Sequence, residues 1–211
     1  MADKDVRDIR RTYDHDVLLE EDAGMDPFAL FSRWFDQALA SEMEGTAMTL
    51  STGGEHPSSR TVLLKEFRNG EFVFFTNYAS QKGQAISNHP NVSLLFFWQT
   101  LQRQVRIEGR ATKVSEQESV DYFQSRPFES QIGALASHQS DALVNREELD
   151  QRYEDLLEVY RNKTVPKPDH WGGYAVIPER IEFWQGRPSR LHDRLLYIKS
   201  GNNWQRKRLS P

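Results

Sequence analysis

The sequence predicts an α+β fold in which peripheral helices cover the openings of a mostly antiparallel β-barrel. Five β-rich runs follow one another between residues 47 and 115, separated by polar turn signals. Helical patterns come next, and strands return after residue 170. Because strands and helices are largely grouped, alternating βαβ units are not expected.

The length and composition favour one folded domain. A chain of 211 residues with 37% hydrophobic and 11% aromatic residues can bury a substantial core. Residues 1–25 are polar and charged without a strong period, so we expect a flexible N-terminal arm there. Residues 26–211 are expected to form the single domain, and the sequence contains no internal repeat.

The first predicted helix lies in "DPFALFSRWFDQALASE". Asp26 is the expected N-cap, and Pro27 suits the first helical position. Its apolar residues recur at the spacing of one helix face, namely Leu30, Trp34, Phe35 and Leu39. The β-rich runs that follow are "AMTLST", "SRTVLLKEF", "EFVFFTN", "NVSLLFFWQ" and "RQVRIEGRATKVS".

The remaining elements follow from the same signals. A short helix is expected in "SQKGQAISNHP", between two strands, and further helices are expected at 115–125, 128–137 and 146–161. Pro166 and Pro168 mark a loop. The chain then returns to strands in "HWGGYAVIPERIEFWQ" and "RLLYIKSGNNWQRKRL", where "SGNN" predicts a hairpin turn.

Several classes of function are disfavoured. The formal net charge of −4 gives no overall reason to expect nucleic-acid binding. The chain contains no cysteine, so disulfides, thiolate metal sites and a cysteine nucleophile are excluded, and redox chemistry would need a cofactor. No HExxH, GxSxG or full GxxxxGK[ST] pattern is present, so no metal site, serine hydrolase or P-loop nucleotide site is indicated.

The sequence gives no sign of membrane insertion. Its first residues lack the apolar core of a signal peptide. No stretch approaches the roughly 20 apolar residues of a membrane helix. We therefore expect a cytoplasmic protein.

The stretch "IEFWQGRPSRLHDRL" carries an unusual concentration of cationic groups. In an extended strand Arg190, His192 and Arg194 would share one face, where like charges repel. An arginine can fork onto phosphate oxygens, and a neutral histidine can donate or accept a proton. Trp184 is either a ligand-packing surface or ordinary core. The pattern favours a phosphorylated ligand.

Two other stretches suit anion binding. In the strand "SRTVLLK", Arg60 and Lys65 lie on opposite faces, although both could simply be solvent-exposed. In "DYFQSRPFESQ", Pro127 interrupts a helix, which places Arg126 and Ser130 near a new helix N-terminus. An ordinary corner between helices with a solvated arginine is equally consistent.

A third anion site is predicted at a junction between a strand and a helix. Ser80, Gln81 and Lys82 lie where backbone donors and a cation converge. Gln139 and Ser140 are uncharged hydrogen-bonding residues that could contact a heterocycle or a phosphate. By themselves, these two residues also fit an ordinary loop.

These motifs together resemble the pyridoxine/pyridoxamine 5′-phosphate oxidase family. The likeness is carried by "IEFWQGRPSRLHDR", "SRTVLLK", "FFTNYASQK", "VSLLFFW", "LQRQVRIEG", "YFQSRPFESQIGA", "HQS" and "WQRKRLSP". It covers most of the chain, in order and at matching spacing. Within the arm, "RRTY" resembles the segment that closes over substrate in this family.

The resemblance implies an FMN-binding split β-barrel that works as a homodimer, with FMN at the subunit interface. It implies a cofactor site formed by Arg60, Thr61, Val62, Leu63, Leu64, Lys65, Phe75, Thr76, Gln81, Lys82, Gln104, Gln139, Ser140, Trp184 and Arg194. It implies a substrate site formed by Arg10, Tyr13, Lys65, Tyr122, Arg126, Ser130, Arg190, Leu191 and His192. Arg190 and His192 are the implied catalytic residues.

The implied reaction is the oxidation of pyridoxamine or pyridoxine 5′-phosphate to pyridoxal 5′-phosphate, with FMN as cofactor and molecular oxygen as the oxidant that yields hydrogen peroxide. Two phosphorylated ligands would explain cations on more than one surface. Arg60 is then assigned to the flavin and Lys65 to the substrate phosphate, together with Tyr122, Arg126 and Ser130. Arg190 and His192 would lie over the substrate ring, and Arg194 would turn toward the cofactor.

This chain departs from the family pattern at two positions. Gln81 stands where family members commonly carry arginine, which predicts weaker binding of the FMN phosphate. Phe75 replaces a frequent tyrosine. A split-barrel flavin-binding protein with a different reductase role, or a pyridoxal phosphate carrier, is the alternative interpretation.

Overall fold

The structure is a computed structural model that describes Arg7 and residues 11–211. The described chain divides into two compact units, each of which is considered separately. The first unit contains the described residues up to Met48 together with Leu94–Glu108 and Glu179–Pro211. The second contains Thr49–Ser93 and Gly109–Pro178.

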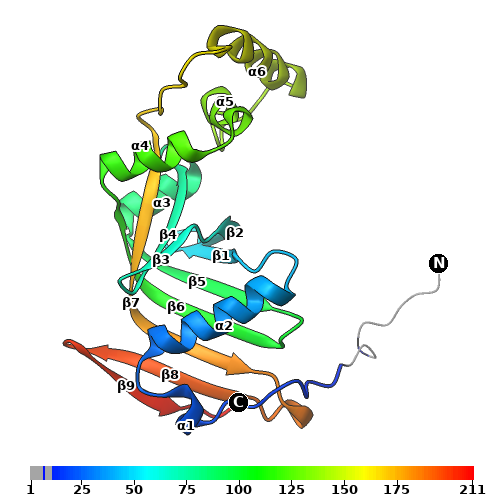
Figure 1. The fold of residues 1–211 in the computed structure, drawn as a ribbon, viewed down its shortest axis with the longest axis vertical. Coiled ribbons are helices and arrows are strands. Elements are labelled where there is room, and N and C mark those ends of the chain that lie inside the picture. Colours follow the sequence, from blue (N-terminus) through cyan, green and yellow to red (C-terminus); the bar gives the residue numbers. More distant parts are fainter. Residues whose placement is uncertain (1–6, 8–10) are drawn as a thin grey trace. The chain divides into compact units, whose positions relative to one another are not determined.

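The predicted α+β class with a mostly antiparallel split barrel is confirmed. Within the described residues, nine strands form a sheet in the order β2-β1-β5-β6-β7-β4-β3, with β8 paired to β7 and β9 to β8 (Figure 1). The strands are β1 (Ala47–Thr52), β2 (Ser58–Leu63), β3 (Glu66–Arg68), β4 (Glu71–Asn77), β5 (Asn91–Trp98), β6 (Arg103–Lys113), β7 (Trp171–Gln185), β8 (Asp193–Ser200) and β9 (Asn203–Arg208). The pairs β3–β4, β4–β7, β7–β8 and β8–β9 are antiparallel.

Each predicted helix is present. The helices are α1 (Glu20–Ala23), α2 (Pro27–Ser41), α3 (Gln81–Asn88), α4 (Glu116–Ser125), α5 (Phe128–Ala136) and α6 (Arg146–Tyr160). Asp26 caps α2 as expected, because its side chain accepts the backbone N–H of Phe28. Ser80 caps α3 in the same way through the backbone N–H of Gly83. Helix α1 lies within the polar N-terminal segment and was not expected.

Aromatic residues form the core of the first unit. Phe31 and Trp34 of α2 pack on the sheet, where Trp34 meets Phe183 edge-on at 5.3 Å between ring centroids. Phe31 and Phe96 lie 5.5 Å apart. Leu39 was predicted on the same helix face but is 50% exposed. The buried face of α2 is therefore formed by Leu30, Phe31, Trp34 and Ala38, and does not include Leu39.

The segment predicted as a flexible arm has a structured C-terminal part. Leu18 and Ala23 are almost fully buried in the first unit. Tyr197 of β8 donates its hydroxyl to the carbonyl of Gly24, and Arg206 of β9 donates to the carbonyls of Glu20 and Gly24. Flexibility of residues 1–25 stays a prediction, but residues 18–24 make specific contacts.

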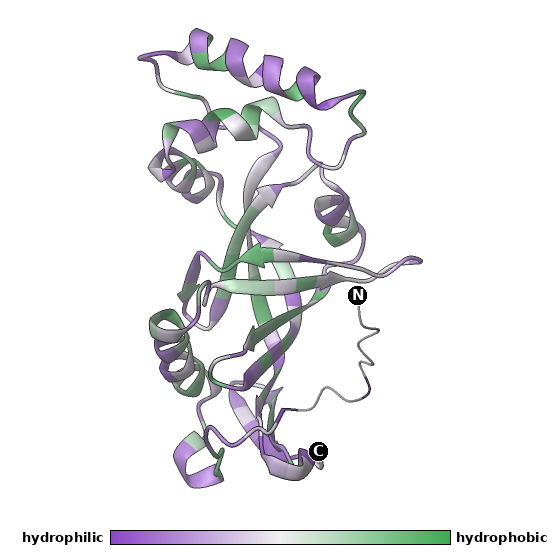
Figure 2. Cartoon of the chain, turned by 90° about the vertical axis from the view of Figure 1, so that its right-hand side faces the viewer, coloured by the Kyte–Doolittle hydropathy of each residue, from purple (hydrophilic) through white to green (hydrophobic). Residues whose placement is uncertain are grey.

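The second unit has a separate core under its helices. Phe123, Ile132, Val165 and Trp171 are buried together. Helices α5 and α6 lie side by side (Figure 1). None of the residues of α6, all of which are described, is buried, and the helix is mostly hydrophilic in Figure 2. Among the described residues, no helix is long and apolar enough to span a membrane.

Candidate active site

A cavity of about 520 Å³ lies in the second unit. Many of the predicted ligand-binding residues line it, namely Thr61, Val62, Leu63, Lys65, Phe75, Thr76, Lys82, Tyr122, Arg126, Ser130 and Gln139. Residues that the sequence did not single out complete the lining, namely Asn77, Gly133, Ala134, Ser137 and Trp171. The fold thus brings together stretches that are up to about 110 residues apart in the chain.

Arg126 lines the cavity and lies at the break between helices α4 and α5. Arg126 is the C-cap of α4 and has extended backbone angles, as the following Pro127 requires. Its guanidinium lies over the ring of Trp171 at 4.9 Å. Its Nη1 is buried and has no hydrogen-bond partner among the described residues. Burial lowers the pKa of Arg126 below its usual value.

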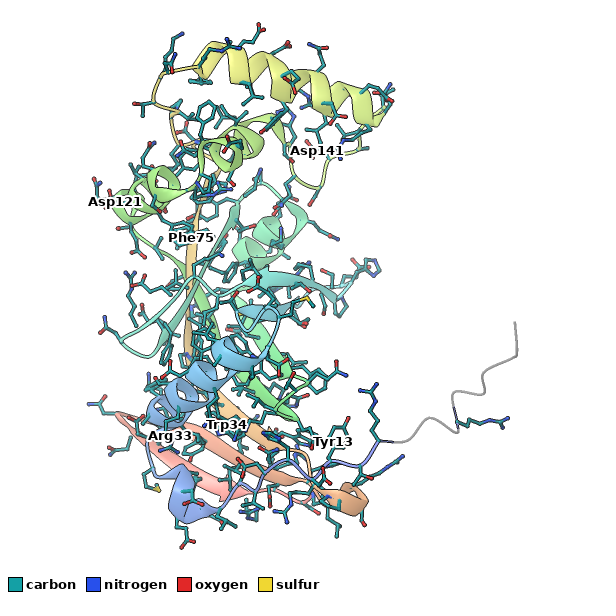
Figure 3. The ribbon with its side chains drawn as sticks, turned by 45° about the vertical axis from the view of Figure 1, so that its right-hand side comes forward. Tyr13, Arg33, Trp34, Phe75, Asp121 and Asp141 are labelled. Carbon is teal, nitrogen blue, oxygen red and sulfur yellow. The ribbon has the colours of Figure 1, made fainter. Side chains whose placement is uncertain are left out.

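Aromatic rings form a wall beside this guanidinium. Phe75 of β4 stacks on Tyr122 of α4 with 3.9 Å between centroids, and on Trp171 at 5.5 Å (Phe75 is labelled in Figure 3). Burial raises the pKa of Tyr122, which keeps its hydroxyl protonated at neutral pH. A cation next to flat apolar surfaces and a neutral hydroxyl is suited to a phosphorylated aromatic ligand.

Lys82 supplies a second cation, from the first turn of α3. Its Nζ donates to Gln139 Oε1 at 2.7 Å and to Ser80 Oγ at 3.3 Å. Burial and then the neighbouring charge of Arg60 lower the pKa of Lys82. Burial also lowers the pKa of Arg60. Two partly buried cations near a helix N-terminus favour a bound anion.

The other predicted residues of the second unit lie around the cavity. Arg60 is not part of the lining; its guanidinium donates to Ser58 Oγ at 2.6 Å. Leu64 is buried in the core, and Lys65 follows the end of β2. Arg60 therefore lies within β2 and Lys65 lies beyond its end, so the two cations are not placed on opposite faces of one strand.

The loop after α5 reaches the N-terminus of α3. Ser140 Oγ accepts the backbone N–H of Gln81 at 3.2 Å. Ser140 has a φ of 79°, in the left-handed region. The side chain of Gln81 is exposed. This position is therefore open to a ligand or to solvent.

A second cluster of predicted residues lies in the first unit. Tyr13 meets Trp184 and His192 edge-on, with 5.9 Å between centroids in each pair, and Trp184 lies 4.6 Å from His192. Tyr13, labelled in Figure 3, lies beside the connection from β7 to β8. A Cβ on Gly186 would come within 2.8 Å of Tyr13, so glycine allows this close approach.

The expected strand geometry of residues 190–194 is wrong. Residues Pro188–Arg190 form the 3₁₀ turn η2, in which Ser189 and Arg190 have positive φ values of 57° and 63°. Strand β8 begins only at Asp193, so Arg190, His192 and Arg194 do not alternate on one strand. The physical reason is that β7 and β8 are antiparallel neighbours, and the chain must reverse within this short connection.

The side chains of this turn differ in their surroundings. Arg190 and Leu191 are exposed, and Leu191 is 69% accessible to solvent. His192 is half-buried, and its Nδ1 accepts the backbone N–H of Arg187 at 3.1 Å. Burial and the charge of Arg190 lower the pKa of His192, against a smaller opposing effect of Asp193.

Arg194 lies opposite Trp184 across strands β7 and β8. Its Nε donates to Glu182 Oε1 at 2.7 Å, and its Nη1 donates to the carbonyl of Ser210 at 2.8 Å. Glu182 is almost fully buried and was not singled out from the sequence. Its only sequence signal is a carboxylate inside the apolar run "IEFW". Gln104 is half-buried in β6, and Arg10 lies outside the described residues.

Together, the sheet and the cavity define a class of protein: an α+β split barrel with a site suited to phosphorylated aromatic ligands. The sequence profile of the family described as pyridoxamine 5′-phosphate oxidase matches residues 35–160. The profile of the pyridoxine 5′-phosphate oxidase C-terminal dimerisation region matches residues 171–211. The chain belongs to the pyridoxine/pyridoxamine 5′-phosphate oxidase family.

Individual relatives agree with this assignment. The chain is 50% identical to the pyridoxine/pyridoxamine 5′-phosphate oxidase of Trichormus variabilis, with 99% of this chain and 100% of the relative covered. It is also 50% identical to that of Leptospira biflexa, with 98% and 99% covered. Among solved structures, PhzG of Burkholderia lata, in complex with tetrahydrophenazine-1-carboxylic acid, has a TM-score of 0.87 at 32% identity, with 93% of this chain and 98% of that chain covered.

A more distant structure supports the fold alone. An FMN-binding protein of Nostoc punctiforme that is related to pyridoxamine 5′-phosphate oxidase has a TM-score of 0.72 at 15% identity. It covers 89% of this chain and 100% of its own. The split-barrel architecture is thus retained at low sequence identity.

Proposed function

We propose that the cavity residues and the cluster around His192 carry out the family reaction. The protein is an FMN-dependent oxidase that converts pyridoxamine 5′-phosphate and pyridoxine 5′-phosphate to pyridoxal 5′-phosphate with molecular oxygen, producing hydrogen peroxide. With the amine substrate, hydrolysis of the imine by water also releases ammonia. The observation that carries the assignment of the cavity is the buried Nη1 of Arg126, which lacks a partner within the described part of the chain. Such a group is costly unless an anion binds it.

We assign two phosphate groups to residues in the cavity lining and beside it. We assign the substrate phosphate to Lys65, Tyr122, Arg126 and Ser130, because a buried guanidinium, an ammonium and two hydroxyls are suitable donors. We assign the FMN phosphate to Arg60 and Lys82 at the N-terminus of α3, with Gln81 and Ser140 beside them. The flat surfaces of Phe75 and Trp171 provide apolar contact.

The chemistry is assigned to the turn between β7 and β8. FMN supplies the hydride acceptor for the C4′ carbon of the substrate. Because Nδ1 of His192 accepts a backbone hydrogen bond, the neutral ring carries its proton on Nε2. The Nε2–H group can therefore hold or move a proton at the C4′ substituent. Arg190, exposed on η2, is assigned to orienting that substituent, and Tyr13 to covering it.

The protein is a homodimer, and its C-terminal region is the dimerisation region of the family. We propose that FMN lies at the subunit interface, with the cavity of one subunit and the His192 cluster of the other serving one reaction. Dimers mixed from Arg126→Ala and His192→Ala subunits test this arrangement. They regain activity if each site combines two subunits, because one of the two sites is then intact. Activity no higher than that of either variant alone would contradict it.

The reaction itself is tested with purified, FMN-loaded protein. Under air, we expect equal amounts of hydrogen peroxide and pyridoxal 5′-phosphate from pyridoxamine 5′-phosphate. Without oxygen, the same substrate should bleach the yellow flavin absorption. Tight substrate binding without turnover would instead favour a carrier, and bleaching by a different substrate would favour another oxidoreductase.

We also place the enzyme in the cytoplasm. The complete lack of cysteine is compatible with a reducing compartment. Cell fractionation with an antibody against the protein would test this location; recovery in an exported fraction would contradict it.

A further inference from the structure

We propose that Asp193 is a positioning residue for the reaction: its carboxylate joins the N-terminal segment that covers the site to the turn that carries His192. The proposal rests on the function proposed above. Asp193 is the first residue of β8, and its side chain is 15% exposed. It does not need to touch substrate or flavin to act in this way.

Three separate segments donate hydrogen bonds to this one carboxylate. Oδ2 accepts from the backbone N–H of Leu18 at 3.2 Å and from Nη1 of Arg187 at 3.0 Å. Oδ1 accepts from Nη1 of Arg208 at 2.8 Å. The donors come from the N-terminal segment, from the connection between β7 and β8, and from β9. Three hydrogen bonds, two of them from charged groups, hold this partly buried carboxylate in one position.

The contact with Arg187 leads directly to His192. The side chain of Arg187 is held by Asp193, and its backbone N–H donates to His192 Nδ1. That hydrogen bond keeps Nδ1 as an acceptor, and so leaves the proton of the neutral ring on Nε2. Releasing Arg187 would free the turn to move and allow either nitrogen of His192 to carry the proton.

The contact with Leu18 leads to Tyr13. Arg208 donates to the carbonyl of Leu18 at 2.9 Å and forks onto the carboxylate of Glu20 at 2.6 and 2.7 Å. Further along the segment, Gln102 Oε1 accepts the backbone N–H groups of Asp14 and His15. The segment is therefore held at several points up to Tyr13, which contacts the rings of Trp184 and His192.

The effect of Asp193 on two different parts of the site gives a kinetic signature. In Asp193→Asn the side chain keeps its size but loses its charge. Its hydrogen bonds to Arg187 and to the N-terminal segment both weaken. We expect kcat to fall about tenfold because His192 loses its orientation, and the substrate KM to rise severalfold because the segment covers the site less well.

Two further variants separate the two effects. Arg187→Gln removes only the contact on the side of His192, so kcat should fall with little change in KM. Glu20→Gln is the matched carboxylate-to-amide control on the other side of Arg208, and it should raise KM without changing kcat. If Asp193→Asn does not fold, Arg187→Gln still tests the link to His192.

Two measurements on the FMN-bound protein do not depend on turnover. Nitrogen-15 NMR should show the Nε2–H tautomer of His192 in the unaltered protein and in Glu20→Gln, but a tautomer mixture in Asp193→Asn. Trypsin should cleave after Arg11 severalfold faster in Asp193→Asn. The proposal is overturned if Asp193→Asn leaves both the His192 tautomer and kcat unchanged. It is also overturned if this variant only loses stability, without a change in the tautomer or in kcat. Inactivity of the unaltered protein would count against the proposed function, while the tautomer and cleavage results would still decide the role of Asp193.

Discussion

Replacing Arg126 by alanine should weaken substrate binding and leave the fold nearly intact. The guanidinium lines the cavity and lies over Trp171 at 4.9 Å. A hydrogen bond between charged groups contributes about 1.5 to 3 kcal/mol. Divided by about 1.4 kcal/mol per decade, this loss raises KM by roughly 10- to 150-fold. Because phosphate binding is the same in ground state and transition state, kcat should change little.

The stability of the apoprotein distinguishes a ligand-binding role from a structural one. Arg126→Ala loses a contact between a cation and a ring, about 0.5 to 2 kcal/mol, and removes a buried charge whose desolvation is unfavourable. These changes oppose each other, so we expect the free energy of unfolding to change by less than about 1 kcal/mol.

The assay combines steady-state kinetics, direct titration of pyridoxal 5′-phosphate binding and urea unfolding of the apoprotein. Arg126→Lys keeps the charge without the planar fork and should give an intermediate KM. Arg146→Ala removes an exposed arginine of α6 and should behave like the unaltered protein. The reasoning is refuted if the binding constant stays within twofold of the original, or if Arg126→Ala unfolds several kcal/mol more easily.

Three further predictions concern the cofactor site and its scaffold. Arg194→Ala should speed FMN release more than it lowers the melting temperature, because Glu182 loses the ion pair with Arg194 and keeps the one with Arg106; normal FMN retention would contradict the cofactor role. Gln81→Arg should slow FMN release by up to roughly fivefold, in a salt-dependent way, because it adds an exposed charge; an equal effect in high salt would contradict an electrostatic cause. Gly83→Ala should lower the melting temperature by several degrees, because a Cβ would lie 2.2 Å from the carbonyl oxygen of Tyr78; an unchanged melting curve would contradict this packing.

Local sequence signals were sufficient to predict helices α2 to α6, but not the short helix α1. Asp26 was predicted as an N-cap, and its side chain accepts the backbone N–H of Phe28. Ser80, Ser115 and Asn145 are the same kind of signal, because each stands at an N-cap and its side chain accepts a backbone N–H of the first turn. These signals act over three or four residues, so they can be read without knowing the fold. The "SGNN" hairpin is equally local, and Gly201 there has the positive φ that such a turn needs.

The turn before β8 could not be predicted in the same way. Alternation suggested one strand through residues 190–194, whereas antiparallel pairing of β7 with β8 forces the chain to reverse there. Pairing between strands is a long-range property that a pattern within one segment does not contain. The roles of Glu182 and Asp193 are hidden for the same reason, because their partners lie on other segments of the chain.

Anion binding should stabilise the apoprotein, because burial disfavours the charged forms of the cavity residues Lys82 and Arg126 when no anion is bound. The pKa of Lys82 is lower in the folded than in the unfolded chain. The unfolded chain therefore holds more protons between these two pKa values, and the stability of the apoprotein rises with pH through that window. A bound phosphate favours the charged form of Lys82 and so opposes this rise of stability with pH. Phosphate should therefore stabilise the protein most at neutral pH, and less as Lys82 loses its proton.

Inorganic phosphate provides the test, with chloride at equal ionic strength as the control. At 100 times its dissociation constant, phosphate should stabilise the apoprotein by about 2.7 kcal/mol at neutral pH. The shift should shrink as the pH rises through the lowered pKa of Lys82, because the lysine then loses the proton that holds the phosphate. It should also shrink in Lys82→Gln, whose apoprotein should itself be slightly more stable at neutral pH. Equal melting temperatures in phosphate and chloride would mean that the cavity cations do not hold an anion, and the assignment of both phosphate sites would fail with them.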